Sequence, residues 1–277
     1  MQRERVADDI YVFTSDLYAQ VTASAIITSA GVVLVDTLAY PSETLEMKAF
    51  IEHRLGKRIS YLINSHFHAD HTIGTCFFEG ATIVSHALCR SLLDERGRDS
   101  LEHVRTLSDD MRSVELVLPE IVFEEGTLTL YVGNKTLQMR HTPGHSPDSI
   151  VCAVQEDRVL IAADTMMPIP YFVDGSYEDL IASLKSLQGS NYENIVQGHG
   201  EVILRGEIEE KIESDLSYMA QLDRAVADAL ASGSPLEAID VEACGKSRVL
   251  LNGMIQQLHQ ENVLALAQQQ REKVEQL

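Results

Sequence analysis

Apolar positions divide the chain into a β-rich part and a helical tail. Residues 10–36 are rich in Val, Ile and Thr and run or alternate apolar, and Ala30-Gly31 interrupts the run, which predicts strands joined in a hairpin. Helical spacing then extends from Pro41 to about Arg54, and a short apolar strand is expected at residues 59–63. Strand and helix therefore alternate from the start of the chain.

The same alternation continues to residue 163. A helix is expected to begin within residues 72–78, followed by a strand at 81–85 and a helix over 86–111. Five more strands are expected, at residues 121–123, 128–132, 135–140, 149–154 and 158–163. The pattern predicts two β-rich halves that flank helical segments, which is a mixed α/β (α+β) fold.

The last quarter of the chain is almost wholly helical in pattern. On this basis we expect a domain of residues 1–204 and a C-terminal helical extension of residues 205–277. The acid-rich run at 207–215 is interpreted as a solvated helix face. An apolar stripe near the end is expected to pack against residues 205–240 or against a second subunit in a homo-oligomer, and it consists of Leu251, Met254, Ile255, Leu258, Val263 and Leu266.

Charge and cysteine content narrow the possible functions. The net charge of −20 repels nucleic acid and anionic membrane surfaces, so we expect neither as a partner and favour a small-molecule substrate. The first residues are charged and no uncharged apolar run approaches the ~20 residues of a membrane helix, which predicts a cytoplasmic protein. The four cysteines show no CxxC spacing, which argues against disulfides or a thiolate zinc site.

The clearest chemical signal is the segment Asn-Ser-His-Phe-His-Ala-Asp-His at residues 64–71, directly after a predicted strand. Imidazole nitrogen and carboxylate oxygen are typical zinc ligands, and a curled loop can direct such side chains toward two ions. Similar groups occupy three further turns at strand ends, where a rigid sheet fixes the ligand and glycine lets the backbone approach an ion. These turns are Thr142-Pro143-Gly144-His145, Ala163-Asp164-Thr165 and Gln197-Gly198-His199-Gly200.

This series, an HxHxDH motif followed by a lone His, a lone Asp and a lone His, resembles the metallo-β-lactamase superfamily over roughly residues 10–203. The resemblance implies an αββα sandwich with the site at one edge between two sheets. It also implies two divalent ions, with zinc expected and iron or manganese able to bind similar ligands. By the resemblance, His66, His68 and His145 hold one ion, Asp70, His71 and His199 hold the other, and Asp164 bridges both.

Such a pair of ions implies hydrolysis. Two metals about 3.5–4 Å apart share a water, lower its pKa toward ~7 and polarise the oxygen of the bond to be cleaved, so the attacking group is a metal-bridging hydroxide. Asp70 is expected to orient this hydroxide or to pass a proton to the leaving group. The loop at 166–172 is expected either to wall the substrate pocket, with the Tyr171 hydroxyl facing an oxyanion, or simply to pack.

The substrate is less well defined, because members of this superfamily cleave β-lactams, thioesters, lactones and phosphoesters with similar ligands. The bridging Asp164 makes the chain more similar to the glyoxalase II-like and lactonase branches than to clinical β-lactamases, which have Cys or Ser there. We therefore expect a small ester-like substrate, namely a lactone, a thioester or a related ester. The alternatives are β-lactam or phosphoester and phosphotriester hydrolysis and, from another class, a non-catalytic metal-bound binding module.

Overall fold

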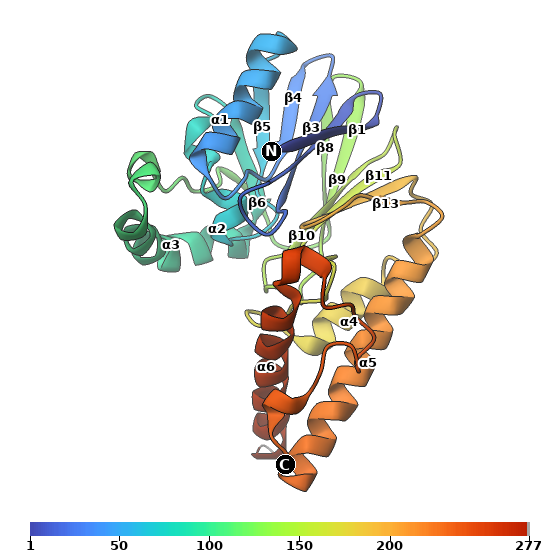
Figure 1. Cartoon of the computed structure of the whole chain (residues 1–277). Helices are drawn as coiled ribbons and strands as arrows, with labels where there is room; N and C mark the ends of the chain where they lie inside the picture. The colour runs from blue at the N-terminus through green and yellow to red at the C-terminus, as the bar shows by residue number, and fades with distance from the viewer. Residues whose placement is uncertain (276–277) are drawn as a thin grey trace.

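The computed structural model describes residues 1–275, which form two β-sheets with helices outside them (Figure 1). The first sheet has seven strands in sequential order, antiparallel from β1 to β4 and parallel from β4 to β7. Its strands are β1 (Gln2–Ala7), β2 (Ile10–Thr14), β3 (Thr22–Thr28), β4 (Gly31–Val35), β5 (Ile59–Ile63), β6 (Thr82–His86) and β7 (Ile121–Phe123). The strands expected at the start of the chain and at 59–63 and 81–85 are thus confirmed.

The second sheet has six strands in the order β13-β12-β11-β10-β9-β8, and only β11 and β12 pair in parallel. Its strands are β8 (Thr127–Val132), β9 (Lys135–His141), β10 (Ile150–Val154), β11 (Val159–Ala163), β12 (Asn194–Gln197) and β13 (Ile203–Leu204). Because β9, β11 and β12 run in the same direction, their carboxyl ends lie at the same edge of the sheet.

Alternating side chains divide the core into layers. In β4, Val33 and Val35 face the core between the sheets, whereas Val32 and Leu34 pack on the outer side. In β10, every second residue from Ile150 to Val154 likewise faces inward, while the residues between them face outward. The outer face of the first sheet packs on α1 (Pro41–Ala49), and that of the second on α4 (Tyr177–Lys185) and on the C-terminal helices. This is the αββα arrangement that the family resemblance implies.

The C-terminal extension begins with α5 (Ile208–Ser232) and ends with α6 (Ile255–Glu275). The two helices lie side by side below the sandwich, and the segment between them returns the chain so that α6 starts close to the sheets (Figure 1). Leu251, Ile255, Val263 and Leu266 of the predicted apolar stripe are buried, and the last three join the core formed with α4 and α5. The stripe therefore packs within the chain, while the boundary at residue 204 and a homo-oligomer stay predictions. Within residues 1–275 no helix is both long enough and apolar enough to cross a membrane.

Several expected boundaries differ from those in the structure. The helix expected within 72–78 instead begins inside the HxHxDH motif as α2 (Ala69–Thr72), so Asp70 and His71 are helical. The long helix α3 (Ala87–Leu107) is shorter than expected and is followed by a 3-10 turn, Asp109–Ser113. The stretch from 233 to 254 is mostly turns rather than helix.

The sequence suggested that the acid-rich run at 207–215 is a solvated helix face, but the structure shows that part of this run is buried. Asp215 is fully buried, accepts a hydrogen bond from Lys246 Nζ at 2.7 Å and also pairs with Lys211. Lys211 also donates a hydrogen bond to the carbonyl of Met167, in the loop that follows β11. Burial lowers the pKa of Lys211, while Asp215 counteracts this effect. Through its two lysine partners, Asp215 thus connects α5 to the segment before α6 and to the loop after β11.

Substitution of Asp215 by Asn is expected to lower the free energy of unfolding by about 3–5 kcal/mol, because it leaves the buried ammonium group of Lys246 and the partly buried one of Lys211 without their shared counter-charge. Glu213→Gln is the matched control on the same helix, since Glu213 is exposed, and it should change stability by less than about 0.5 kcal/mol. Equilibrium urea unfolding measures both variants. Equal, small losses in the two variants would show that the buried cluster contributes little.

Candidate metal centre

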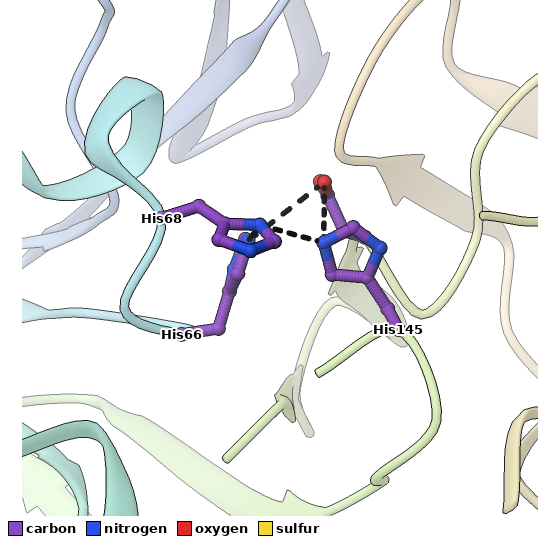
Figure 2. A group of neighbouring side chains, drawn as sticks. His66, His68 and His145 are labelled. Atoms are coloured by element: carbon purple, nitrogen blue, oxygen red, sulfur yellow. Dashed lines mark hydrogen bonds and ion pairs between the residues drawn. The ribbon is translucent and has the colours of Figure 1, made fainter. Parts of the chain in front are cut away.

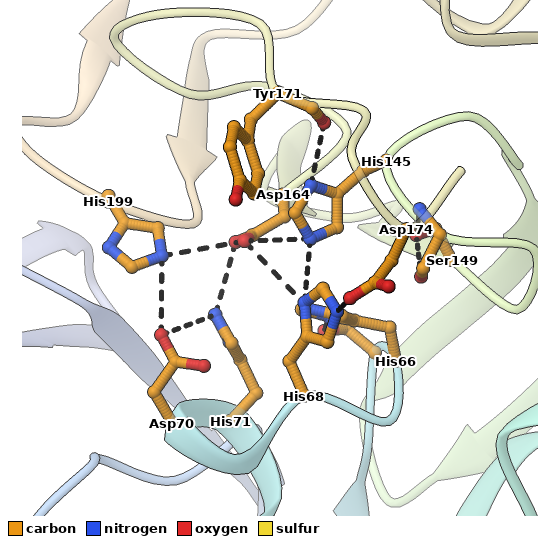
Figure 3. Close-up of polar contacts among 12 residues, drawn as sticks. His66, His68, Asp70, His71, His145, Ser149, Asp164, Tyr171, Asp174 and His199 are labelled. Carbon is orange, nitrogen blue, oxygen red and sulfur yellow. Dashed lines mark hydrogen bonds and ion pairs between the residues drawn. The ribbon is translucent and has the colours of Figure 1, made fainter. Parts of the chain in front are cut away.

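The seven side chains predicted as ligands meet at one edge of the sandwich, where both sheets end (Figure 3). They follow β5, β9, β11 and β12 directly or after a short turn. Backbone hydrogen bonds join the two sheets at this edge: Ile150 N donates to Ser65 O at 2.9 Å, and Thr22 N donates to Gly198 O at 2.8 Å. The ligand-bearing loops are therefore fixed relative to one another before any ion binds.

One group of potential ligands consists of His66, His68, His145 and Asp164 (Figure 2). Nδ1 of His68 lies 3.0 Å from Nε2 of His66 and 2.9 Å from Nε2 of His145. The Oδ2 atom of Asp164 lies 3.2 Å from Nε2 of His145. Three nitrogens and one carboxylate oxygen thus converge, which is a donor set that suits a four-coordinate divalent ion.

The second group consists of Asp70, His71 and His199, and Asp164 lies between it and the first group. Asp164 Oδ1 is 3.1 Å from Nε2 of His71, and Asp164 Oδ2 is 3.4 Å from Nε2 of His199. Asp70 Oδ2 is 3.5 Å from the same nitrogen of His199. Asp164 therefore contacts histidines of both groups, which is the geometry required of a bridging carboxylate (Figure 3).

The outward-facing ring nitrogens set the orientation of the imidazoles. His71 Nδ1 donates to Asp36 Oδ2 at 3.0 Å, His145 Nδ1 to the carbonyl of Tyr171 at 2.8 Å, and His199 Nδ1 to the carbonyl of Ala19 at 2.9 Å. Because these acceptors hold a proton on Nδ1, each Nε2 faces into the site and is the atom that would bind an ion. His68 is turned the other way, with Nε2 against Asp174 Oδ2 at 3.0 Å and Nδ1 facing inward.

Protonation preferences agree with a cation site. Burial and the neighbouring His71 hold the pKa of His66 well below its ordinary value, and burial lowers that of His145 to about 4. Burial alone would raise the pKa of Asp164, but His71 and His199 hold it well below the ordinary range. For His199, Asp164 outweighs burial and raises the pKa. Asp164 and neighbouring carboxylates also raise the pKa of His71 well above its ordinary value, against the effect of burial. Without an ion, the site therefore favours neutral His66 and His145 but protonated His71 and His199 beside an ionised carboxylate, and an ion that binds the last two rings displaces their protons.

Two further observations fit a bound ion. Among the described residues, the buried atoms Nε2 of His71 and Oδ1 of Asp164 lie 3.1 Å apart but make no well-formed hydrogen bond to each other or to another group, although buried polar atoms are normally paired. A Cβ atom on Gly198 would lie 1.7 Å from Asp164 Oδ1, so only glycine leaves room for the carboxylate in this position. The residues present thus fit the divalent ions that the sequence resemblance implies.

Gly198→Ala is expected to displace the Asp164 carboxylate, weaken metal binding and destabilise the fold by about 1–3 kcal/mol, because the added methyl overlaps that side chain. Metal titration together with thermal unfolding measures both effects. Gly206→Ala is the control, since a Cβ at Gly206 meets no other atom within 4 Å. Unchanged metal affinity in Gly198→Ala would contradict the requirement for glycine.

A cavity of about 390 Å³ opens beside these ligands. Asp70, His68 and Asp164 form its floor, and Met254, Leu258 and Glu261 of the C-terminal extension form part of its wall. Tyr171 also lines it, which is one of the two arrangements considered for this loop, but its hydroxyl donates to Glu261 Oε2 at 2.6 Å, and burial raises the pKa of Tyr171. Contact between Tyr171 and an oxyanion stays a prediction, and it requires this hydroxyl to leave Glu261.

Sequence reasoning missed two carboxylates that position ligands. Asp36 follows β4 and accepts hydrogen bonds from the backbone N and the hydroxyl of Ser65 as well as from His71. It does so with a positive φ of 61°, an unusual backbone conformation for a residue with a side chain. The signal was present, since an Asp directly after an apolar strand is what identified Asp164. Asp174, which contacts His68, has no comparable sequence signal.

Comparison with known proteins places the chain in a family. Residues 18–199 match the Metallo-beta-lactamase superfamily, which is more than half of the chain. Among curated proteins, the Beta-lactamase-like protein 2 homolog of Caenorhabditis elegans is 24% identical over 216 residues, which cover 77% of this chain and 66% of that relative. The chain thus spans slightly less than two thirds of the length of that protein.

Solved structures share the fold at low identity. A metallo-β-lactamase from Pontibacter korlensis matches with a TM-score of 0.66 and 17% identity, covering 79% of this chain and 98% of its own. The sec-alkylsulfatase Pisa1 from Pseudomonas sp. matches with a TM-score of 0.72 and 16% identity, covering 96% of this chain and 50% of its own. On the match of residues 18–199 and the two-sheet fold, the chain belongs to the metallo-β-lactamase superfamily, whose members are mostly metal-dependent hydrolases.

Proposed function

We propose that this chain is a binuclear metal-dependent hydrolase of small ester-like substrates, such as a lactone, a thioester or a related ester. The observation that carries the proposal is the position of Asp164, whose two oxygens lie within 3.4 Å of histidines from both ligand groups. A non-catalytic binding module has no need for a complete second group joined to the first through a shared carboxylate. Both groups also border one cavity, where a substrate has access to them.

The two ions would be held by the seven side chains already described, with zinc favoured by the nitrogen and carboxylate donors. When bound, divalent ions supply activation of water at neutral pH and polarisation of the scissile carbonyl. In the overall reaction, water oxygen bonds to the carbonyl carbon, the bond to the alcohol or thiol breaks, and the leaving group takes up a proton.

Asp70 is the ligand best placed to handle that proton. Its side chain is 19% exposed and lines the cavity, whereas that of Asp164 is 3% exposed. A carboxylate at the cavity floor is able to orient the attacking water and to carry its proton to the leaving group. Asp164, enclosed by imidazoles, keeps its charge and holds the two ligand groups together.

The ester class is favoured over β-lactams because the shared position carries Asp164 rather than a thiol or a hydroxyl. None of the four cysteines belongs to either ligand group. The cavity wall also includes carboxylates, Asp174 and Glu261, and these disfavour a polyanionic substrate such as a nucleic acid.

An activity screen tests this function. Purified protein is loaded with zinc, iron or manganese and assayed on lactones, aryl esters, thioesters, β-lactams and phosphodiesters, before and after removal of metal with a chelator. The proposal expects turnover of at least one ester class that chelation abolishes and added metal restores. Turnover of only β-lactams or phosphodiesters would overturn the substrate class, and no turnover under any condition would favour the binding module.

A further inference from the structure

A second cavity adjoins the metal site. Its volume is about 290 Å³, and His68, Ala69 and Asp174 line both this cavity and the one above the ligands. His68 directs Nδ1 toward the metal ligands and Nε2 toward Asp174, so its ring stands at the boundary between the two spaces (Figure 3). The two cavities are therefore adjacent, and a ligand with its reactive group at the metal ligands reaches the second cavity by passing the His68–Asp174 pair.

The walls of this second cavity are mainly apolar. Phe67 comes from within the HxHxDH motif and Ile73 follows α2, whereas Leu101 and Val104 come from α3 and Leu116 from the segment before β7. All five are only half-buried, although apolar side chains of this size are usually buried in a core. A concave surface of large, half-buried apolar side chains is typical of a site for an apolar ligand group.

Three charged side chains line this cavity, Arg96, Glu115 and Asp174, and Glu115 is exposed to solvent. Asp174 accepts a hydrogen bond from His68 at 3.0 Å, and the guanidinium of Arg96 lies 5.7 Å from the ring centroid of Phe67. The interaction of Arg96 with the ring leaves its charge facing solvent at an exposed position. The cavity at the metal ligands thus suits the polar part of a ligand, and the second cavity suits its apolar part.

We propose that the second cavity binds the acyl arm of the substrate, so that the enzyme prefers esters of straight-chain apolar acids over acetyl esters. This inference rests on the proposed hydrolase function and specifies its substrate class. The carbonyl lies at the metal ligands, the acyl chain extends past His68 between Phe67 and α3, and hydrolysis releases the chain as its carboxylate while the alcohol or thiol leaves with a proton.

Two chain-length series test the inference on metal-loaded protein. The first measures kcat/KM for p-nitrophenyl esters from acetyl to octanoyl, and the second measures binding of alkyl hydroxamates of the same lengths by calorimetry. Each methylene that enters the cavity should raise kcat/KM and affinity about fourfold, which corresponds to about 0.8 kcal/mol, until the cavity is full. Hydroxamate binding needs no turnover, so it reports on the cavity even if the ester series shows no hydrolysis.

Ser100→Trp fills the second cavity from an exposed position on α3, and Ser91→Trp is the matched control, because Ser91 is exposed on the same helix but does not line the cavity. Ser100→Trp is expected to abolish the dependence on chain length in both series, whereas Ser91→Trp should keep the wild-type dependence and the wild-type turnover of the acetyl ester.

The outcomes separate the two proposals. Hydrolysis whose rate does not depend on chain length, or a dependence that Ser100→Trp leaves intact, overturns the acyl site and leaves the hydrolase standing. Chain-length-dependent hydroxamate binding that Ser100→Trp abolishes, without hydrolysis of any ester, supports the acyl site and contradicts the hydrolase function.

Discussion

Replacing Asp164 by Asn is expected to reduce kcat/KM by on the order of 10³-fold or more, which corresponds to at least about 4 kcal/mol of lost transition-state stabilisation. The carboxylate contacts His71, His145 and His199 within 3.4 Å, so its charge and both oxygens serve two ligand groups at once. An amide of the same shape still packs against Gly198, but it has no negative charge and one of its two former oxygens becomes an NH₂ group, which repels a cation. Enzyme kinetics and metal analysis of the variant measure the effect.

The exposed carboxylate of Asp94 on α3 offers a matched control for this change. Asp94→Asn removes the same charge at a residue that belongs to neither ligand group and lines neither cavity, and it should retain wild-type turnover and metal content. If Asp164→Asn keeps two tightly bound ions and near-normal turnover, Asp164 does not link the two ligand groups and the proposed site is wrong.

Asp70→Asn is expected to lower kcat by about 10²–10⁴-fold while most of the fold is retained. Asp70 lies in α2 at the cavity floor, 3.5 Å from His199 Nε2, and its partial exposure leaves it accessible to substrate and water. An amide still occupies this position but does not take up a proton. Steady-state kinetics on the metal-loaded variant, measured beside the wild type, give the change in kcat.

Asp94→Asn again provides the comparison, and circular dichroism checks that the overall secondary structure is retained. A small change in kcat together with a large rise in KM would instead assign Asp70 to substrate binding. Unchanged activity would remove Asp70 from the proposed chemistry altogether.

The ligands were predictable because their signals are local. Each of the four motifs follows an apolar strand or lies in a turn with glycine, and strands of like direction end at one edge of a sheet, so side chains that are distant in the sequence meet there. Asp36 carries the same signal after β4, and the same argument applied there predicts a carboxylate at the site. The local pattern does not specify whether such an Asp binds an ion or orients a ligand. Asp36 belongs to the second kind, because it contacts His71 and Ser65.

Two structural features were missed for different reasons. Strand β1 is an edge strand with mostly exposed side chains, so its sequence lacks the apolar alternation that marks a half-buried strand. Asp215 was predictable in hindsight, because it lies at helical spacing between Ile212 and Met219, which are both buried on the same face of α5. Charge content alone does not reveal a buried acid, whereas its position within the apolar stripe does.

The contacts that the C-terminal extension makes with the site could not be predicted from the sequence. Glu261 and Tyr171 are 90 positions apart and meet only because the segment before α6 returns the chain to the site. The second cavity likewise depends on α3 packing near the HxHxDH motif, where Phe67 is an unassigned position between two ligands. Such surfaces result from the tertiary arrangement of separate elements, and no pattern within one segment predicts them.

The central claim is that two metal ions share Asp164, and the most direct test is the metal content of the purified protein, measured by mass spectrometry for the wild type and for Asp164→Asn. The proposed site predicts two divalent ions per chain in the wild type and at most one tightly bound ion in the variant. One ion or none in the wild type after incubation with zinc, iron or manganese, or two in the variant, would contradict a binuclear centre bridged by Asp164.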